Sequence, residues 1–135
     1  MGCATMADSD LIMNYQAQAF NTMSKGELLV KLYDGELKDL KYASILLKQK
    51  DCDRAREYLT KSKNILNYLI AILNDKYSLS ENLRTIYLNF LGQIVFASAY
   101  GDASYIDKII PTVQDLRDSW AEAEKTVQMQ NKKKG

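Results

Sequence analysis

The scarcity of turn-forming residues constrains the fold of this chain more than any other feature. One proline and six glycines occur among its 135 residues. Sheet-rich domains need many tight turns, and glycine and proline supply most of them. We therefore expect long helices joined by few loops. They should form one domain, because a chain of 135 residues is short for two.

Four stretches place apolar residues at intervals of three and four, which is the spacing of one helix face. The expected spans run from 24 to 47, from 53 to 73, from 78 or 80 to 100, and from 102 to 127. Helices with short connections pack as neighbours in antiparallel order. The sequence therefore predicts an all-α fold, an antiparallel up-down four-helix bundle over residues 24–127.

Local signals predict how these helices begin and end. Ser24 and Glu27 form a capping-box pattern at the first helix, and the segment 51–53 provides a break and an N-cap for the second. Either Ser78 or Ser80 is expected to cap the third helix. Pro111 lies two turns inside the fourth, where it predicts a kink or a restart.

The two ends of the chain lie outside this periodic region. Residues 1–12 show no sustained period and are expected to be a flexible or non-native extension. Residues 13–23 form a short, semi-apolar N-terminal segment that we expect to pack on the bundle. Residues 128–135 are expected to form a polar tail.

The chain has no histidine, which removes most side-chain chemistry. Ser-His and Cys-His nucleophile pairs, histidine metal sites and di-iron bundles are all excluded. Cys3 and Cys52 have no metal-site spacing and are expected to be reduced thiols. The carboxylates of Asp34 and Glu36 are expected on a solvated surface. No catalytic residue, metal or cofactor is therefore predicted.

Charge and hydropathy limit the partners as well. Eighteen basic and 17 acidic residues give a net charge of +1, so nothing draws the chain strongly to nucleic acid. No stretch approaches 18 continuous apolar residues, and no signal peptide is recognisable, so we expect no membrane insertion and a cytoplasmic location.

The third helix is more apolar than a bundle needs. Twelve of the 18 residues from Leu83 to Tyr100 are apolar, which covers most of the circumference of the helix. Such a helix is either central or faces two apolar environments. The second environment is the N-terminal segment, a second copy or a separate polypeptide. The residues outside the core stripe are Leu88, Leu91, Val95, Phe96 and Tyr100, with Leu66 and Ile70 beside them.

Three blocks of sequence resemble the flagellin-specific export chaperone family, FliS. The first runs from Thr22 to Gly35 and contains Leu-Tyr-Asp-Gly, the second is Asn82-Leu83 with Ile86-Tyr87, and the third runs from Leu116 to Ala123 around Arg117 and Trp120. The similar region extends from Tyr15 to Ala123, about four-fifths of the chain.

This resemblance implies a function. Members bind the disordered C-terminal segment of flagellin in the bacterial cytoplasm, prevent premature polymerisation and aid secretion. An export-gate component or a co-chaperone is a further partner that the resemblance suggests, with the protein a monomer or a weak dimer. Tyr15 matches the tyrosine of the family's N-terminal segment. The flagellin-binding residues expected here are Tyr15, Leu66, Ile70, Tyr87, Leu88, Leu91, Val95 and Phe96.

The residues alone leave two other classes open. A bundle that self-associates through the surplus apolar face would have a structural or adaptor role and no flagellin client. An all-helical enzyme would need a convergent polar cluster, and the sequence shows none.

Overall fold

The structure is a computed structural model that describes residues 25–134. It contains four helices: α2 (Lys25–Lys48), α3 (Cys52–Ala71), α4 (Ser78–Tyr100) and α5 (Ser104–Lys134). The described residues form no strand. The prediction of an all-α four-helix bundle is confirmed.

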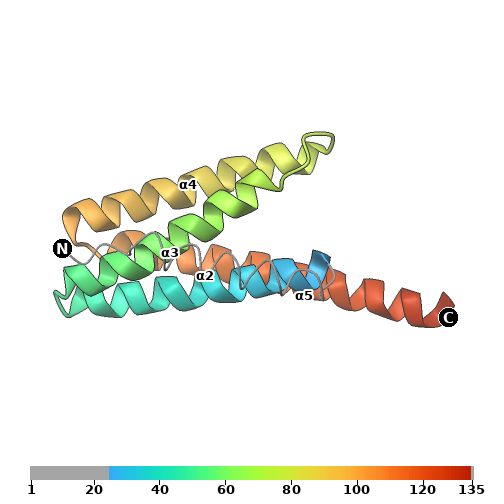
Figure 1. Ribbon diagram of the computed structural model, residues 1–135, viewed down its shortest axis with the longest axis horizontal. Coiled ribbons are helices and arrows are strands. Elements are labelled where there is room, and N and C mark those ends of the chain that lie inside the picture. Colours follow the sequence, from blue (N-terminus) through green and yellow to red (C-terminus); the bar gives the residue numbers. More distant parts are fainter. Residues whose placement is uncertain (1–24, 135) are drawn as a thin grey trace, which may run out of the picture.

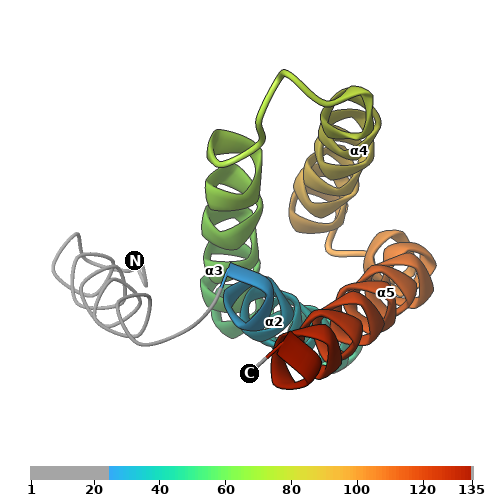
Figure 2. The same cartoon turned by 90° about the vertical axis from the view of Figure 1, so that its right-hand side faces the viewer.

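The helices pack in a ring in which each one runs antiparallel to the next (Figures 1 and 2). α2 packs against α3 and α5, and α4 closes the ring by packing against α3 and α5. Toward the connection 72–77, the α3–α4 pair diverges from the α2–α5 pair (Figure 1). The end of α5 projects past the start of α2.

The core is built from the apolar stripe of each helix. Burying one large aliphatic side chain contributes roughly 1.5–3 kcal/mol, so these stripes supply most of the driving force. α2 is the most enclosed helix, because it packs along its length against both α3 and α5. The largest fully buried apolar side chains are Tyr33, Leu40, Leu59, Leu66, Leu69, Tyr87, Phe90, Ile94, Ile106 and Val113.

Two connections have local causes in the residues that form them. The side chain of Asp51 caps α3 and accepts a hydrogen bond from the backbone N–H of Arg54 at 3.4 Å. α4 ends at Gly101, whose φ of 63° lies in the left-handed region. Glycine adopts this conformation without a Cβ penalty, which ends the helix and turns the chain into α5.

The start of α4 differs from the prediction. Its N-cap is Tyr77, and no side chain makes a cap hydrogen bond there, so the expected cap by Ser78 or Ser80 is wrong. Ser78 is already helical, and Ser80 is buried one turn further on. The serines therefore lie inside the first turn, where their hydroxyls are past the capping position.

α5 is one continuous helix through Pro111, so of the two predicted alternatives, a kink or a restart, the restart does not occur. The proline removes the donor for the carbonyl of Asp107, but both residues are exposed, so water can replace the lost bond. The helix continues to Lys134, through most of the predicted polar tail, since Gln, Met and Lys are good helix formers.

Several sequence predictions fall outside the described residues. These are the Ser24 cap, the extension 1–12, the segment 13–23 and Tyr15.

Gly92 lies inside α4 and Gly101 is its C-cap, and we expect alanine to change the free energy of unfolding in opposite directions at these two positions. Gly101→Ala should lower the free energy of unfolding by about 1–2 kcal/mol, because alanine is strained in the left-handed region. Its Cβ would lie 3.5 Å from Cys52 Sγ, an ordinary contact, so backbone strain alone acts. Urea unfolding of dilute protein measures the change.

Gly92→Ala is the matched control. This glycine is inside α4, and an added Cβ meets no heavy atom within 4 Å. Alanine should therefore raise the free energy of unfolding by about 0.5–1 kcal/mol. Changes of the same sign in both variants would contradict the assignment of Gly101 as a conformational stop.

Candidate functional site

α4 has two apolar faces, as predicted. Its inner stripe consists of Leu83, Tyr87, Phe90, Ile94 and Ala97, all buried. Its outer face carries Leu88, Val95, Phe96 and Tyr100, with exposed fractions of 54%, 51%, 46% and 69%. We call these four residues the outer face of α4. Exposed apolar surface of this kind commonly marks a binding site.

The outer face is also free of charge. No Asp, Glu, Lys or Arg occurs between Arg84 and Asp102. Helices on the surface of a soluble domain ordinarily carry charged residues on the outward side. The sequence of α4 therefore suits contact with another apolar surface better than contact with water.

The structure separates the other predicted site residues into two groups. Ile70 of α3 and Leu91 of α4 are half-buried and pack against the core. Leu66 and Tyr87 lie in the interior, each 1% exposed, so this conformation presents neither of them to a partner.

An aromatic cluster extends the outer face onto α5. The ring centroids of Phe96 and Tyr105 are 5.6 Å apart, and those of Tyr100 and Tyr105 are 6.0 Å apart. Lys108 Nζ lies 5.5 Å from the centroid of the Tyr105 ring. The sequence alone does not predict that Tyr105 or Lys108 belongs to this surface. Their place just after the Gly101 turn, which folds α5 back beside the end of α4, is the feature that brings them to this surface.

A groove between α4 and α5 adjoins the cluster. Its volume is about 420 Å³, and Ile86, Phe90 and Ile109 contribute apolar surface to it. Asn89 and Gln93 line it as well and offer amide groups. Such a lining can hold a peptide by apolar contact and by hydrogen bonds to its backbone.

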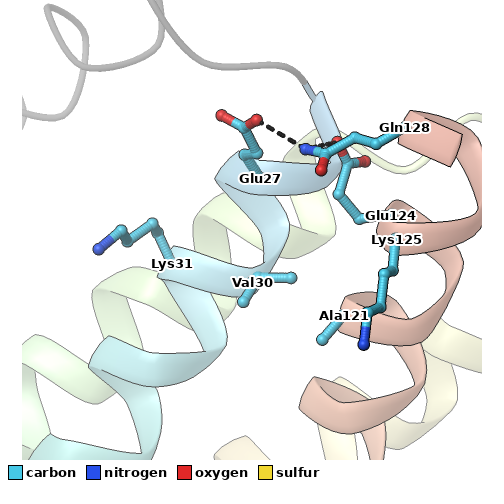
Figure 3. A pocket seen from close by; sticks show the side chains of 7 residues that line it. All are labelled: Glu27, Val30, Lys31, Ala121, Glu124, Lys125 and Gln128. Atoms are coloured by element: carbon cyan, nitrogen blue, oxygen red, sulfur yellow. Dashed lines mark hydrogen bonds between the residues drawn. The ribbon is translucent and has the colours of Figure 1, made fainter. Parts of the chain in front are cut away.

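A second groove, of about 410 Å³, lies between the start of α2 and the end of α5 (Figure 3). Val30 and Ala121 line it from opposite helices. Gln128 Nε2 donates hydrogen bonds to Glu27 Oε1 at 3.0 Å and to Glu124 Oε1 at 3.3 Å. The bond to Glu27 ties the projecting end of α5 to α2, while the bond to Glu124 stays within α5.

The three sequence blocks that carry the family resemblance meet inside the bundle. The hydroxyl of Tyr33 in α2 is hydrogen-bonded to the hydroxyl of Tyr87 in α4. The indole Nε1 of Trp120 in α5 donates to the Tyr33 hydroxyl at 3.3 Å. Beside them, Arg117 Nε donates to Asp34 Oδ1 at 2.8 Å. We call Tyr33, Tyr87 and Trp120 the aromatic hub.

One carboxylate is not where the sequence analysis expected it. Asp34 is exposed as expected, but Glu36 is 1% exposed, so its expected surface position is wrong. Its Oε1 accepts a hydrogen bond from Ser62 of α3, while its Oε2 has no partner among the described residues. Burial raises the pKa of Glu36 well above its usual range. Glu36 is on the face of α2 that packs against α3. A charged residue at this position interrupts the apolar pattern by which a buried face is recognised in the sequence.

The pKa of a neighbouring carboxyl, that of Asp39, is raised as well. Burial raises the pKa of Asp39 to about 6, although the charges of Lys61 and Lys38 oppose the shift.

Within residues 25–134, no cluster of three or more His, Cys, Asp or Glu side chains is suited to a metal ion. In the same part of the chain, no helix is both long and apolar enough to span a bilayer.

Comparison with known proteins matches this arrangement to one family. The family model described as "Flagellar protein FliS" matches residues 9–127. The chain belongs to the FliS family. The matched region contains the aromatic hub and all of α4, and it ends before the last turns of α5.

Two curated FliS proteins are similar over most of their length. The flagellar secretion chaperone FliS of Bacillus subtilis (strain 168) is 32% identical over 109 residues, which cover 81% of this chain and 82% of that protein. The flagellar secretion chaperone FliS of Escherichia coli (strain K12) is 24% identical over 108 residues, which cover 78% of this chain and 79% of that protein. FliS is a family of chaperones rather than of enzymes, and a chaperone implies a client protein.

The hydrogen bonds of the aromatic hub predict different losses of stability for two Tyr→Phe substitutions. Tyr33→Phe removes the hydroxyl that serves both Tyr87 and Trp120, so two polar groups lose their partner. Tyr87→Phe leaves only the Tyr33 hydroxyl with one bond fewer. An unsatisfied buried group costs about 1–3 kcal/mol, so Tyr33→Phe should destabilise the bundle more than Tyr87→Phe does. Denaturant unfolding checks the order, and equal losses would contradict it.

Glu36 predicts how stability depends on pH. Its pKa is higher in the folded state than in the unfolded state, so folding favours the protonated form. This contribution is complete below the pKa of the unfolded state and is lost as the pH rises toward the pKa of the folded state. The free energy of unfolding should therefore fall as the pH rises above about 5, since unfolded glutamate titrates near 4.3.

Glu36→Gln is the control for this dependence. The amide preserves the shape and can still accept a hydrogen bond from Ser62, but it does not ionise. The variant should lose most of the decline above about pH 7, because the pKa of Asp39 is about 6 and its carboxyl is then largely ionised in the folded state as well. Chemical unfolding at a series of pH values tests this, and an unchanged slope in the variant would contradict it.

Proposed function

We propose that this FliS protein binds the disordered C-terminal segment of flagellin in the bacterial cytoplasm and holds it unpolymerised until secretion. The outer face of α4 carries this proposal, because four large apolar side chains stand exposed on a stretch of helix, 85–100, that has no charged residue. Leu91 and Ile70, which are half-buried and pack against the core, are the further residues proposed to contact the client.

The chemistry required is binding alone. A disordered client loses chain entropy as it orders, and coupled folding of this kind costs about 2–5 kcal/mol or more of the gross interaction energy. Burial of apolar surface against Leu88, Val95 and Phe96 offsets this cost. The proposal requires no nucleotide, metal or covalent step.

The proposed surface has two kinds of contact to offer. The outer face of α4 supplies exposed apolar side chains, and the adjoining groove supplies the amides of Asn89 and Gln93. An amphipathic client helix needs the first, and client backbone groups that remain outside a helix need the second. A client that orders only in part can therefore be held along both.

The direct test is calorimetry of the full chain with a synthetic flagellin C-terminal peptide. Val95→Asp should weaken binding by roughly tenfold or more, because it places an unpaired charge in an apolar interface. Val95 is 51% exposed, so the change should leave the fold intact. Absence of binding by the unmodified protein at tens of micromolar would refute the proposal.

Ile45→Asp is the matched control. Ile45 is also 51% exposed, but it lies on α2. It should bind the peptide like the unmodified protein. Equal weakening by both substitutions would show that added charge, rather than the outer face of α4, accounts for the loss. A circular dichroism melt of each variant separates lost binding from lost folding.

A further inference from the structure

We propose that Lys108 binds the terminal carboxylate of the client, so that the client chain ends where the groove between α4 and α5 meets the aromatic cluster. The inference rests on the function proposed above, because it assigns a place to the end of that client segment. It adds one charged contact to the apolar contacts of the outer face of α4.

The groove between α4 and α5 carries a single charge. Of the described residues that line it, Lys108 alone is charged. Its Nζ lies 5.5 Å from the centroid of the Tyr105 ring, a favourable contact that holds the ammonium group beside the aromatic cluster. A groove with one cation and no anion in its lining complements a ligand that carries a negative charge. The uncharged lining residues are Thr85, Ile86, Asn89, Phe90, Gln93, Ile109 and Thr112.

The acidic residues of α5 do not occupy Lys108. Asp107 is held on the side of α2, where its Oδ1 accepts a hydrogen bond from Ser44 at 2.6 Å and its Oδ2 lies 3.0 Å from Lys48 Nζ. Asp115 follows Lys108 by seven residues, which is about 10 Å along the helix axis.

Asp102 is the acidic residue that precedes α5. Its Oδ1 accepts a hydrogen bond from the backbone N–H of Ser104 at 2.9 Å. The hydrogen bonds with Ser104 lower the pKa of Asp102 most, and the charge of Lys108 lowers it less. None of the ion pairs between described residues includes Lys108. The ammonium group is therefore available to a carboxylate from another molecule.

The proposed client brings such a carboxylate because it is the end of a chain. A terminal carboxylate is ionised at neutral pH, since its ordinary pKa is about 3.5. The groove has a volume of about 420 Å³, which suits the last residues of a chain better than a long continuous segment. Ile86 and Ile109 offer apolar contact to the final side chain, and the amides of Asn89 and Gln93 can donate hydrogen bonds to carboxylate or backbone oxygens.

A charged contact also gives the client a defined position. The outer face of α4 is apolar, and apolar contacts are not directional, so they allow a bound helix to slide along the surface. A charge-assisted hydrogen bond between an ammonium group and a carboxylate is directional and roughly twice as strong as a neutral one. Lys108 therefore fixes where the client ends, while the outer face supplies apolar burial.

Calorimetry with two synthetic peptides tests this contact. Both have the sequence of the flagellin C-terminal segment, but one ends in a free carboxylate and the other in a carboxamide, so they differ only at the terminus. Each is titrated into the unmodified full chain and into Lys108→Met, which keeps a long side chain and removes its charge. The matched control is Lys125→Met, at an exposed position of α5 that lines the groove between α2 and α5.

The unmodified protein should bind the free acid at least roughly fivefold more tightly than the amide. Lys108→Met should bind both peptides equally, with the affinity that the unmodified protein has for the amide. Lys125→Met should keep the preference for the free acid, and Lys108→Arg, which retains a cation, should keep most of it. Lys108 is exposed, so these variants should fold, and a circular dichroism melt checks that they do.

Three results would overturn the inference while client binding stands. In the first, the unmodified protein binds the acid and the amide equally. In the second, the preference for the acid persists in Lys108→Met, which would place the terminal carboxylate elsewhere. In the third, Lys108→Met weakens both peptides by the same factor, which would assign Lys108 to another group of the client. If neither peptide binds, the proposed function itself fails, and this inference fails with it.

Discussion

The hydroxyl of Tyr33 holds together parts of the bundle that the ring of neighbouring helices does not join directly. α2 and α4 lie diagonally across the ring, and the hydrogen bond between Tyr33 and Tyr87 crosses that diagonal. Trp120 brings α5 to the same oxygen. A buried polar contact of this kind requires a particular register of three helices, because any slip would leave polar groups without partners. The apolar stripes drive the helices together, and the aromatic hub selects one arrangement among those that the stripes allow.

This division explains why the residues that make the family recognisable are not those proposed to contact the client. The three sequence blocks supply the aromatic hub and the adjoining Asp34–Arg117 ion pair. They are Leu-Tyr-Asp-Gly, Ile-Tyr and the block around Arg117 and Trp120. Their roles lie inside the bundle or across its seams. The outer face of α4 needs only apolar side chains of suitable size, and many sequences can provide those.

Periodicity was sufficient to predict the four helices and both faces of α4, because each follows from spacing along one helix. The features that sequence reasoning missed depend on contacts between helices. Tyr87 was assigned to the client surface, yet it points inward, since a tyrosine at the edge of a stripe suits either side. Glu36 was expected in solvent because carboxylates usually are, and only the position of Ser62 on α3 shows why it can be buried. Tyr105 joins the site because the chain reverses at Gly101.

The position of Trp120 has a practical consequence. It is the only tryptophan of the chain, and its indole reaches the hub while remaining partly exposed. Indole fluorescence therefore arises from a single place, at the junction of three helices and away from the outer face of α4. Its emission should report whether the interior stays assembled while another molecule occupies the surface. Trp120 is thus an intrinsic fluorescent probe, which distinguishes docking on a rigid bundle from docking that loosens it.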